Sequence, residues 1–248
     1  MLSNTLTRLV ALLASASGAL AGTPPGFEPA TQESLFVAYG DVAALDGVEV
    51  AKEITQTAPI IASENKLDGA SFAILMIDID IPFDAPHTFL HWLQTGITQS
   101  SSATPVNTTT GPKDVFILTV PQDVEAFAPY AGPAPPARVP LSHRYTEILV
   151  DTSDVSDEAL ATLKAAAATR RNFVALEVLT SAGLEDKVVA GNFFNVTNPG
   201  PVEPPAPTNS SGAGNAPTGV MPKTGVATSY RAGTSLLLVM GALVFFAL

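Results

Sequence analysis

The chain has 248 residues, no cysteine and a formal net charge of −11 at pH 7. Such an acidic surface repels nucleic-acid phosphates and anionic lipid headgroups, so we expect no nucleic-acid partner and no membrane attachment through surface charge. The lack of cysteine rules out disulfides and thiol nucleophiles, so the core alone must hold the fold together.

The first 21 residues resemble a secretory signal peptide. Arg8 supplies the positive start, residues 9–20 form a short apolar run, and Ala19-Leu20-Ala21 has the small-residue pattern of a cleavage site. An uncleaved anchor helix is the alternative, but the run is too short and too rich in Ala and Ser to span a bilayer comfortably. We therefore expect export, with cleavage after Ala21.

Strand-like runs dominate residues 22–197, which we predict to form one folded domain. One helix is expected over 156–171, with Ser156 as its N-cap and Arg170-Arg171 at its end. The prediction is a mostly β domain with a late helix packed on a sheet. The runs rich in β-branched and aromatic residues are 35–39, 72–80, 115–120, 146–151, 172–179 and 188–194.

The apolar run 72–77 indicates a strand buried on both faces, and it leads into two carboxylates. Alternation along the strand places Asp78 and Asp80 on one face, about 6.5 Å apart. A buried carboxylate needs a partner, and it can fix the tautomer of an imidazole whose other nitrogen then binds a ligand. The candidate partners and donors are His91, His143 and Tyr145.

Three motifs together resemble the phosphatidylethanolamine-binding protein family. They are the Asp-x-Asp-x-Pro that ends at Pro82, the tripeptide His91-Trp92-Leu93, and a Pro/Gly loop that runs into His143-Arg144-Tyr145. The resemblance covers nearly all of residues 30–195, and it implies a β-sandwich with peripheral helices and a small pocket for a phosphate-like anion. It also implies a binding protein rather than an enzyme, with no cofactor. The ligand-binding residues that it implies are Asp78, Asp80, His91, Tyr130, Gly132, Pro136, His143 and Tyr145. Tyr130 could either line the rim of the pocket or pack behind it.

The chain departs from the family pattern around this pocket. Ile79 stands where the family has a proline, Leu141 where it has a glycine, and Phe89 where it often has a tryptophan. The altered loop before His143 motivates a second hypothesis, a secreted protein–protein regulator such as an inhibitor of serine carboxypeptidases. A non-enzymatic structural protein of the wall or cell surface is a third.

Metal and hydrolase sites are not indicated. His87 lies four residues before His91, but Thr88 breaks the His-Glu-x-x-His metalloprotease pattern. On a strand the two histidines would lie up to about 13 Å apart, so we expect no metal site and a solvated His87. No Gly-x-Ser-x-Gly elbow occurs, and Ser142 would point away from the adjacent His143 on a strand.

The segment 198–225 is rich in Pro, Gly, Ser, Thr and Ala, and we predict that it forms a disordered stalk. Three sequons, at Asn107, Asn195 and Asn209, fit a glycosylated secreted protein.

Residues 226–248 resemble a GPI-anchor signal, because a polar spacer precedes an apolar tail that is too short to span a bilayer. Attachment is expected at Gly225, with Asn215 or residues 212–214 as alternatives. The Met-Pro-Lys-Thr-Gly stretch that ends at Gly225 also resembles a bacterial cell-wall sorting signal, but that signal normally ends in basic residues. We therefore expect a secreted, cell-surface protein held at the plasma membrane or cell wall by a lipid anchor.

Overall fold

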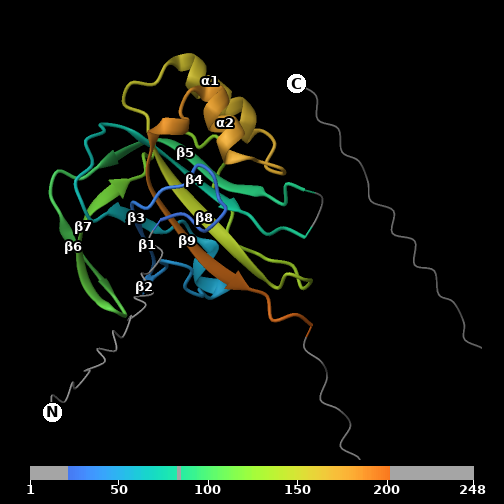
Figure 1. Ribbon diagram of the computed structural model, residues 1–248. Coiled ribbons are helices and arrows are strands. Elements are labelled where there is room, and N and C mark those ends of the chain that lie inside the picture. The colour runs from blue at the N-terminus through green and yellow to red at the C-terminus, as the bar shows by residue number, and fades with distance from the viewer. Residues whose placement is uncertain (1–21, 83–84, 202–248) are drawn as a thin grey trace, which may run out of the picture. The chain divides into compact units, whose positions relative to one another are not determined.

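The computed structural model describes residues 22–82 and 85–201, and that part of the chain is mostly β, as predicted (Figure 1). The strands are β1 (Leu35–Tyr39), β2 (Val42–Ala43), β3 (Ile60–Ser63), β4 (Phe72–Asp78), β5 (Phe89–Gln99), β6 (Thr104–Thr108), β7 (Gly111–Thr119), β8 (Ser142–Asp151) and β9 (Val188–Thr197). The helices are η1 (Lys52–Gln56), α1 (Asp157–Ala167), α2 (Ala175–Ala182) and η2 (Glu185–Lys187).

The strands pair antiparallel in the order β2-β1-β3-β7-β5-β4-β8-β9, and β6 pairs with β7. β5 joins two layers, because it pairs with β4 along most of its length and with β7 only at Thr98 and Gln99. β4, β8 and β9 lie in one layer with β5, and β1, β2, β3 and β7 form the other. Val37 of β1 and Leu149 of β8 meet in one buried cluster, so the core lies between the layers.

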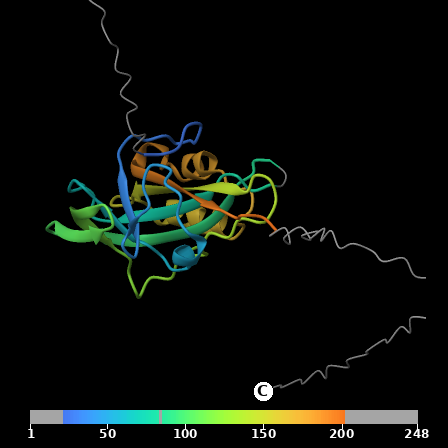
Figure 2. The same ribbon diagram turned by 90° about the horizontal axis from the view of Figure 1, so that it is seen from below.

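β4 lies within the first layer and is buried on both faces, as the sequence predicts. Phe72, Ile74 and Met76 belong to the core between the layers, whereas Leu75 and Ile77 pack under the helices. None of the five has exposed surface. In the turned view the orange α2 and the blue η1 lie on opposite sides of the strands (Figure 2). This strand brings the site's first carboxylate to the edge of the core.

α1 begins where the sequence predicts. The hydroxyl of Ser156 accepts a hydrogen bond of 3.2 Å from the Ala159 N–H and caps the helix. Leu163 is fully buried against the first layer. The helix ends at Ala167 rather than at residue 171, because Arg170 leaves the helical path and its guanidinium bonds to backbone carbonyls near the start of β5.

The prediction of a strand over 172–179 is wrong, because most of this segment belongs to α2. Its β-branched and aromatic residues favour a strand locally. In the structure, however, Ala175 and Leu179 are buried on one side while Leu176 and Glu177 are exposed, which is helical spacing. Packing against α1 and the first layer outweighs the local preference.

The folded domain continues past its predicted end at Thr197. The backbone N–H of Asn198 donates to the Leu141 carbonyl, and its side-chain amide donates to the Pro135 carbonyl, at 2.8 Å each. Gly200 in turn donates to the Asn198 side chain at 3.0 Å. These bonds attach residues 198–200 to the loop before β8, and the stalk expected over 198–225 stays a prediction.

Several sequence predictions concern residues at the surface or at the ends. The signal peptide, the anchor signal, Gly225 and Asn209 lie outside the described residues. Asn107 is exposed on β6, whereas Asn195 is half-buried and its side-chain amide donates to the Gly47 carbonyl at 2.7 Å. Among the described residues, no helix has the length and apolarity needed to cross a membrane. Glycosylation therefore stays a prediction at all three sequons.

Candidate functional site

Asp78 ends β4 and is the buried centre of the site. It is 3% exposed, and its Oδ2 accepts a hydrogen bond of 2.7 Å from Nδ1 of His143 on β8. The register pairs Asp78 with Tyr145, and His143 lies two residues further along on the same face of β8. The predicted pairing of Asp78 with an imidazole is therefore present.

Asp80 does not join this pair, so the expectation that both carboxylates orient histidines is wrong for Asp80. Its Oδ2 accepts from the backbone N–H and the Nε of Arg144, at 2.9 and 2.8 Å, and its Oδ1 accepts from Nη2 at 2.7 Å. The alternation of side chains does not extend to Asp80, because β4 ends at Asp78. The Oδ1 of Asp78 accepts a hydrogen bond of 2.9 Å from the Asp80 N–H, and this bond turns the chain. Asp80 thus anchors the residue next to His143.

His91 reaches the site through an irregularity in β5. Ile77 of β4 pairs with Leu90. The preceding β4 residue, Met76, pairs with Trp92, which leaves His91 as an extra residue without a partner on β4. Because of this bulge, His91 and Trp92 both turn toward the core between the layers, where strict alternation would turn one of them away.

Ala131 and Arg170 fix the position of His91. The His91 carbonyl accepts from the Ala131 N–H at 2.9 Å and from Nη1 of Arg170 at 3.0 Å. Its ring Nδ1 donates to the Ala131 carbonyl at 2.6 Å, since a carbonyl oxygen has no proton to give. The rings of Phe89 and Tyr145 flank the imidazole edge-on, with centroid distances of 5.0 and 5.1 Å.

Two buried polar atoms of the site make no hydrogen bond of ordinary geometry with the described residues, although the Asp78 carboxylate and the backbone at Ala134 and Pro140 interact with their side chains. They are Nε2 of His143 and the hydroxyl of Tyr145, and neither residue has exposed surface. An unpartnered buried polar group costs about 1–3 kcal/mol, so such groups normally have a partner. These two atoms lie on one face of β8 and are poorly satisfied hydrogen-bonding groups of the site.

The two histidines differ in charge because the partners of their Nδ1 atoms differ. Burial opposes protonation of His143, but the hydrogen bond and the charge of Asp78 outweigh it and raise the pKa of this imidazole. Burial lowers the pKa of His91, and the positive charges of Arg170 and His143 act in the same direction. The Ala131 carbonyl and the more distant Asp78 do not compensate. The site therefore combines an imidazole that takes up a proton more readily than usual with one that takes it up less readily.

The loop before β8 holds three further residues that the sequence predicts for the site. The ring of Tyr130 packs on Trp92 at 5.6 Å and its hydroxyl donates to the Thr55 carbonyl at 2.8 Å, so the structure favours packing over a place on the rim. A Cβ atom on Gly132 would lie 2.9 Å from the same carbonyl, which explains the need for glycine there. Pro136 is half-buried in this loop. Tyr130 and Gly132 therefore pack this loop against the segment at Thr55.

Gln56 and Asn198 also hold this loop, and the sequence does not indicate them. The Gln56 side chain donates to the Pro133 carbonyl at 2.9 Å, and the Asn198 side chain donates to the Pro135 carbonyl at 2.8 Å. They fix the segment that orients the His91 ring. Neither residue belongs to a recognisable motif, and both lie far from the loop in the sequence, so only the tertiary structure reveals them.

His87 takes no part in the site. It is exposed in the loop before β5, with a left-handed φ of 63°, and its Nδ1 donates to the Ile81 carbonyl at 3.2 Å. Ser142 is exposed while the adjacent His143 is buried, as expected for neighbours on a strand. Within residues 22–82 and 85–201, no three His, Asp or Glu side chains form a cluster that could hold a metal ion.

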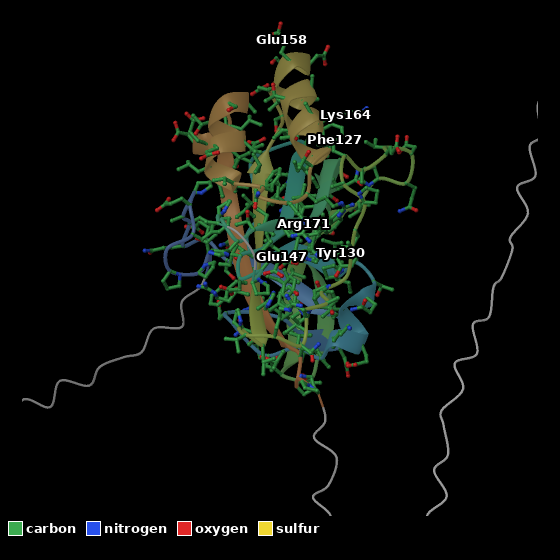
Figure 3. The ribbon with its side chains drawn as sticks, turned by 90° about the vertical axis from the view of Figure 1, so that its right-hand side faces the viewer. Phe127, Tyr130, Glu147, Glu158, Lys164 and Arg171 are labelled. Carbon is green, nitrogen blue, oxygen red and sulfur yellow. The ribbon has the colours of Figure 1, made fainter. Side chains whose placement is uncertain are left out.

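Glu147 is a second buried carboxylate on the same face of β8. It has no exposed surface, its Oε2 accepts from the Asn192 side chain at 3.0 Å, and its Oε1 has no partner among the described residues. Burial raises the pKa of Glu147 to about 8, which the bond from Asn192 only partly opposes. Figure 3 shows Glu147 and Tyr130 among the strands, away from Glu158 and Lys164 of α1.

Comparison with known proteins assigns the chain to a family. The model of the phosphatidylethanolamine-binding protein family matches residues 35–194. A curated relative from Talaromyces stipitatus, phomoidride biosynthesis cluster protein N, is 31% identical over 202 residues, which cover 75% of this chain and 94% of the relative. The chain therefore belongs to the phosphatidylethanolamine-binding protein family.

Solved structures with a similar fold are more distant in sequence. A carboxypeptidase Y inhibitor, crystallised with its cognate proteinase, is 20% identical and covers 66% of this chain and 82% of its own, with a TM-score of 0.46. The phosphatidylethanolamine-binding protein from Plasmodium vivax is 15% identical and covers 70% of this chain and 92% of its own, also with a TM-score of 0.46.

Proposed function

We propose that this protein is a non-catalytic binding protein whose buried site accepts a small anion, such as the phosphate group of a phospholipid headgroup. The observation that carries the proposal is the pair of poorly satisfied polar atoms, Nε2 of His143 and the hydroxyl of Tyr145. An imidazolium paired with Asp78 and a hydroxyl can both donate, and charge-assisted donors of this kind suit an oxyanion.

The surroundings of the site support this proposal. The chain as a whole is acidic, so an anion must be attracted by a local group, and His143, whose pKa the neighbouring Asp78 raises, is a suitable one. His91 and His143 both stand on strands of the first layer, which hold them in place before a ligand arrives. Membership of the family agrees with binding of a small ligand.

The test removes one poorly satisfied donor and keeps the fold. Tyr145→Phe deletes a hydroxyl that makes no hydrogen bond of ordinary geometry with the described residues, so the domain should stay folded while its affinity for phosphoethanolamine falls about tenfold, measured by calorimetry. Thr146→Val is the matched control, because it deletes another unpartnered buried hydroxyl on the opposite face of the same strand. Equal affinities of the two variants and the unmodified protein would rule out this site.

A second candidate function is regulation of another protein, such as inhibition of a serine carboxypeptidase. The observation in its favour is the apolar loop before β8, where Val139 is 84% exposed and Leu141 is 36% exposed. If this loop makes the contact, Val139→Asp should abolish inhibition while Tyr145→Phe leaves it intact. A panel of serine carboxypeptidases that is not inhibited at all would count against this function.

The proposal includes export and a C-terminal lipid anchor, which rest on the sequence alone. Residues 1–21 and 226–248 carry the two signals, and Gly225 is the proposed attachment residue. A phospholipase specific for phosphatidylinositol should release the protein from intact cells. A surface protein that this lipase does not release, or one whose apolar tail remains attached, would contradict the anchor.

A further inference from the structure

β6 lies at the outer edge of the folded domain and has a free side (Figure 1). It pairs with residues 111–115 of β7, and no other strand of the described chain pairs with it. An open strand edge presents backbone groups that a second chain can pair with, which leads to aggregation. Proteins therefore usually protect such an edge, and β6 carries two features that do so.

The first feature is a proline at a position that faces the open edge. In an antiparallel ladder, paired residues alternate between those that exchange two hydrogen bonds and those that exchange none. β6 pairs Pro105 with Asp114 and Asn107 with Pro112. Because a proline has no N–H, both pairs are of the second kind. The backbone groups of Pro105 and Asn107 therefore point away from β7, and Pro105 offers no donor there.

The second feature is the sequon Asn107-Thr108-Thr109, which is open to solvent. Asn107 and Thr109 are both exposed, and Thr109 lies in the tight turn that joins β6 to β7. The Thr109 N–H donates to the Asp41 carbonyl at 2.7 Å, which ties this turn to the turn between β1 and β2. A bulky group on the Asn107 side chain can extend into water without displacing a neighbouring element.

The sequon at Asn195 has the opposite surroundings. Its Nδ2 donates to the Gly47 carbonyl at 2.7 Å. Its backbone N–H donates to the Val48 carbonyl at 2.9 Å, and its carbonyl accepts from the Val50 N–H at 2.8 Å. The segment 47–50 thus lies against the nitrogen that would carry a glycan. A glycan on Asn195 would displace this segment, so a chain that carries one cannot form these three bonds together.

We propose that the folded protein carries an N-linked glycan on Asn107 and none on Asn195, and that this glycan covers the open edge of β6. The inference rests on the export included in the proposed function. Nδ2 of Asn107 forms a bond to the anomeric carbon of an oligosaccharide that is carried on a lipid diphosphate. The bond from that carbon to the diphosphate breaks, the diphosphate leaves with the electron pair, and the amide nitrogen gives up one proton. Because an N-linked glycan is bulky and strongly hydrated, it keeps a second chain from lying along β6.

Glycan mapping of the full chain, expressed in eukaryotic cells and purified in its folded form, tests the assignment. An amidase that removes N-linked glycans converts each occupied asparagine to aspartate, and heavy-oxygen water marks that residue for mass spectrometry. We expect the mark on Asn107 and none on Asn195. A mark on Asn195, or an unmarked Asn107 in a chain that begins at Gly22, would overturn the assignment and leave export standing. An unmarked chain that still contains residues 1–21 would overturn both.

Substitutions in the sequon test the role of the glycan. Asn107→Gln and Thr109→Ala both remove the glycan, whereas Thr109→Ser keeps the sequon and is the matched control. In static light scattering, the molar mass of the first two should rise with protein concentration more steeply than that of the control. Adding Thr104→Lys to Asn107→Gln should reverse this rise, because a lysine on an exposed edge strand opposes pairing. Equal concentration dependence of all variants would show that the glycan does not protect β6.

Discussion

Asp78 and Glu147 are two buried carboxylates that face the core from neighbouring strands, and they differ in their partners. Asp78 accepts a hydrogen bond from His143, with which it forms an ion pair when the imidazole is protonated. Glu147 accepts only from the amide of Asn192, and its second oxygen has no partner among the described residues. Burial without a cation raises the pKa of Glu147 to about 8.

The partner, rather than the position on the strand face, therefore decides the charge of each carboxylate. At the end of β4 the carboxylate favours protonation of His143, and the protonated ring can act on a ligand. In the middle of β8 the carboxyl group keeps its proton at neutral pH and serves as a polar member of the core. Two groups of the same chemistry thus have different effects, one on binding and one on stability.

Replacing His143 by leucine should have the largest effect, because it leaves Asp78 buried without a cation. Breaking a buried ion pair in this way costs about 3–5 kcal/mol of unfolding free energy, measurable by urea denaturation.

The effect of this substitution should depend on pH. The pKa of His143 is raised by folding, so the contribution of its charge is complete below about pH 6.5 and is lost as the pH rises through the folded-state pKa. His87→Asn, in an exposed loop, is the control. A loss no larger than that of the control would mean that Asp78 and His143 are not an ion pair.

Replacing Glu147 by glutamine should change the pH dependence of stability. The unfolded chain loses the Glu147 proton near pH 4.5 and the folded chain near pH 8, so stability falls with rising pH between these values. The slope is about 1.4 kcal/mol per pH unit and flattens above pH 8. Glu147→Gln should remove this slope, and Glu177→Gln, at an exposed position on α2, should keep it. Parallel curves for the unmodified protein and Glu147→Gln would show that Glu147 is ionised in the fold.

Replacing Asp80 by asparagine should have the smallest effect, because the Arg144 side chain is 39% exposed and water screens the pair. We expect a loss of about 1 kcal/mol at neutral pH. Burial would raise the pKa of Asp80, but the bonds from Arg144 lower it overall, so the stabilisation is present above about pH 4 and is lost in stronger acid. Glu64→Gln, in the more exposed pair with Lys113, should change stability by less than about 0.5 kcal/mol. A loss for Asp80→Asn equal to that of Glu64→Gln would show that the bidentate geometry adds nothing.

The sequence predicts the centre of the site well because the residues there combine a local pattern with chemical need. A buried apolar strand that ends in Asp78 must supply a partner for the carboxylate, and His143 is that partner. The family motifs also name His91 and Tyr145, and in the structure the two rings are in edge-on contact. For these residues, local pattern and chemistry point to the same arrangement.

The errors arise where the tertiary structure overrides the local pattern. Asp80 leaves the face of Asp78 because the strand ends between them, and strand ends are poorly defined by sequence. His91, which the family motif does predict for the site, faces the core through a bulge that alternation does not reveal. Residues 172–179 form a helix because packing on α1 and the sheet outweighs their strand preference. Gln56 contacts the loop before β8 across a long stretch of chain, and nothing near it in the sequence indicates this contact.

The most direct test of the site is a histidine-resolved NMR titration of the chain with phosphoethanolamine. The chain has three histidines, so each ring can be followed separately. We predict saturable shifts of His91 and His143, which line the site, and none of His87, which lies in an exposed loop. An unchanged spectrum at millimolar ligand, or shifts of His87 equal to those of the other two, would contradict an anion-binding site at Asp78, His91 and His143.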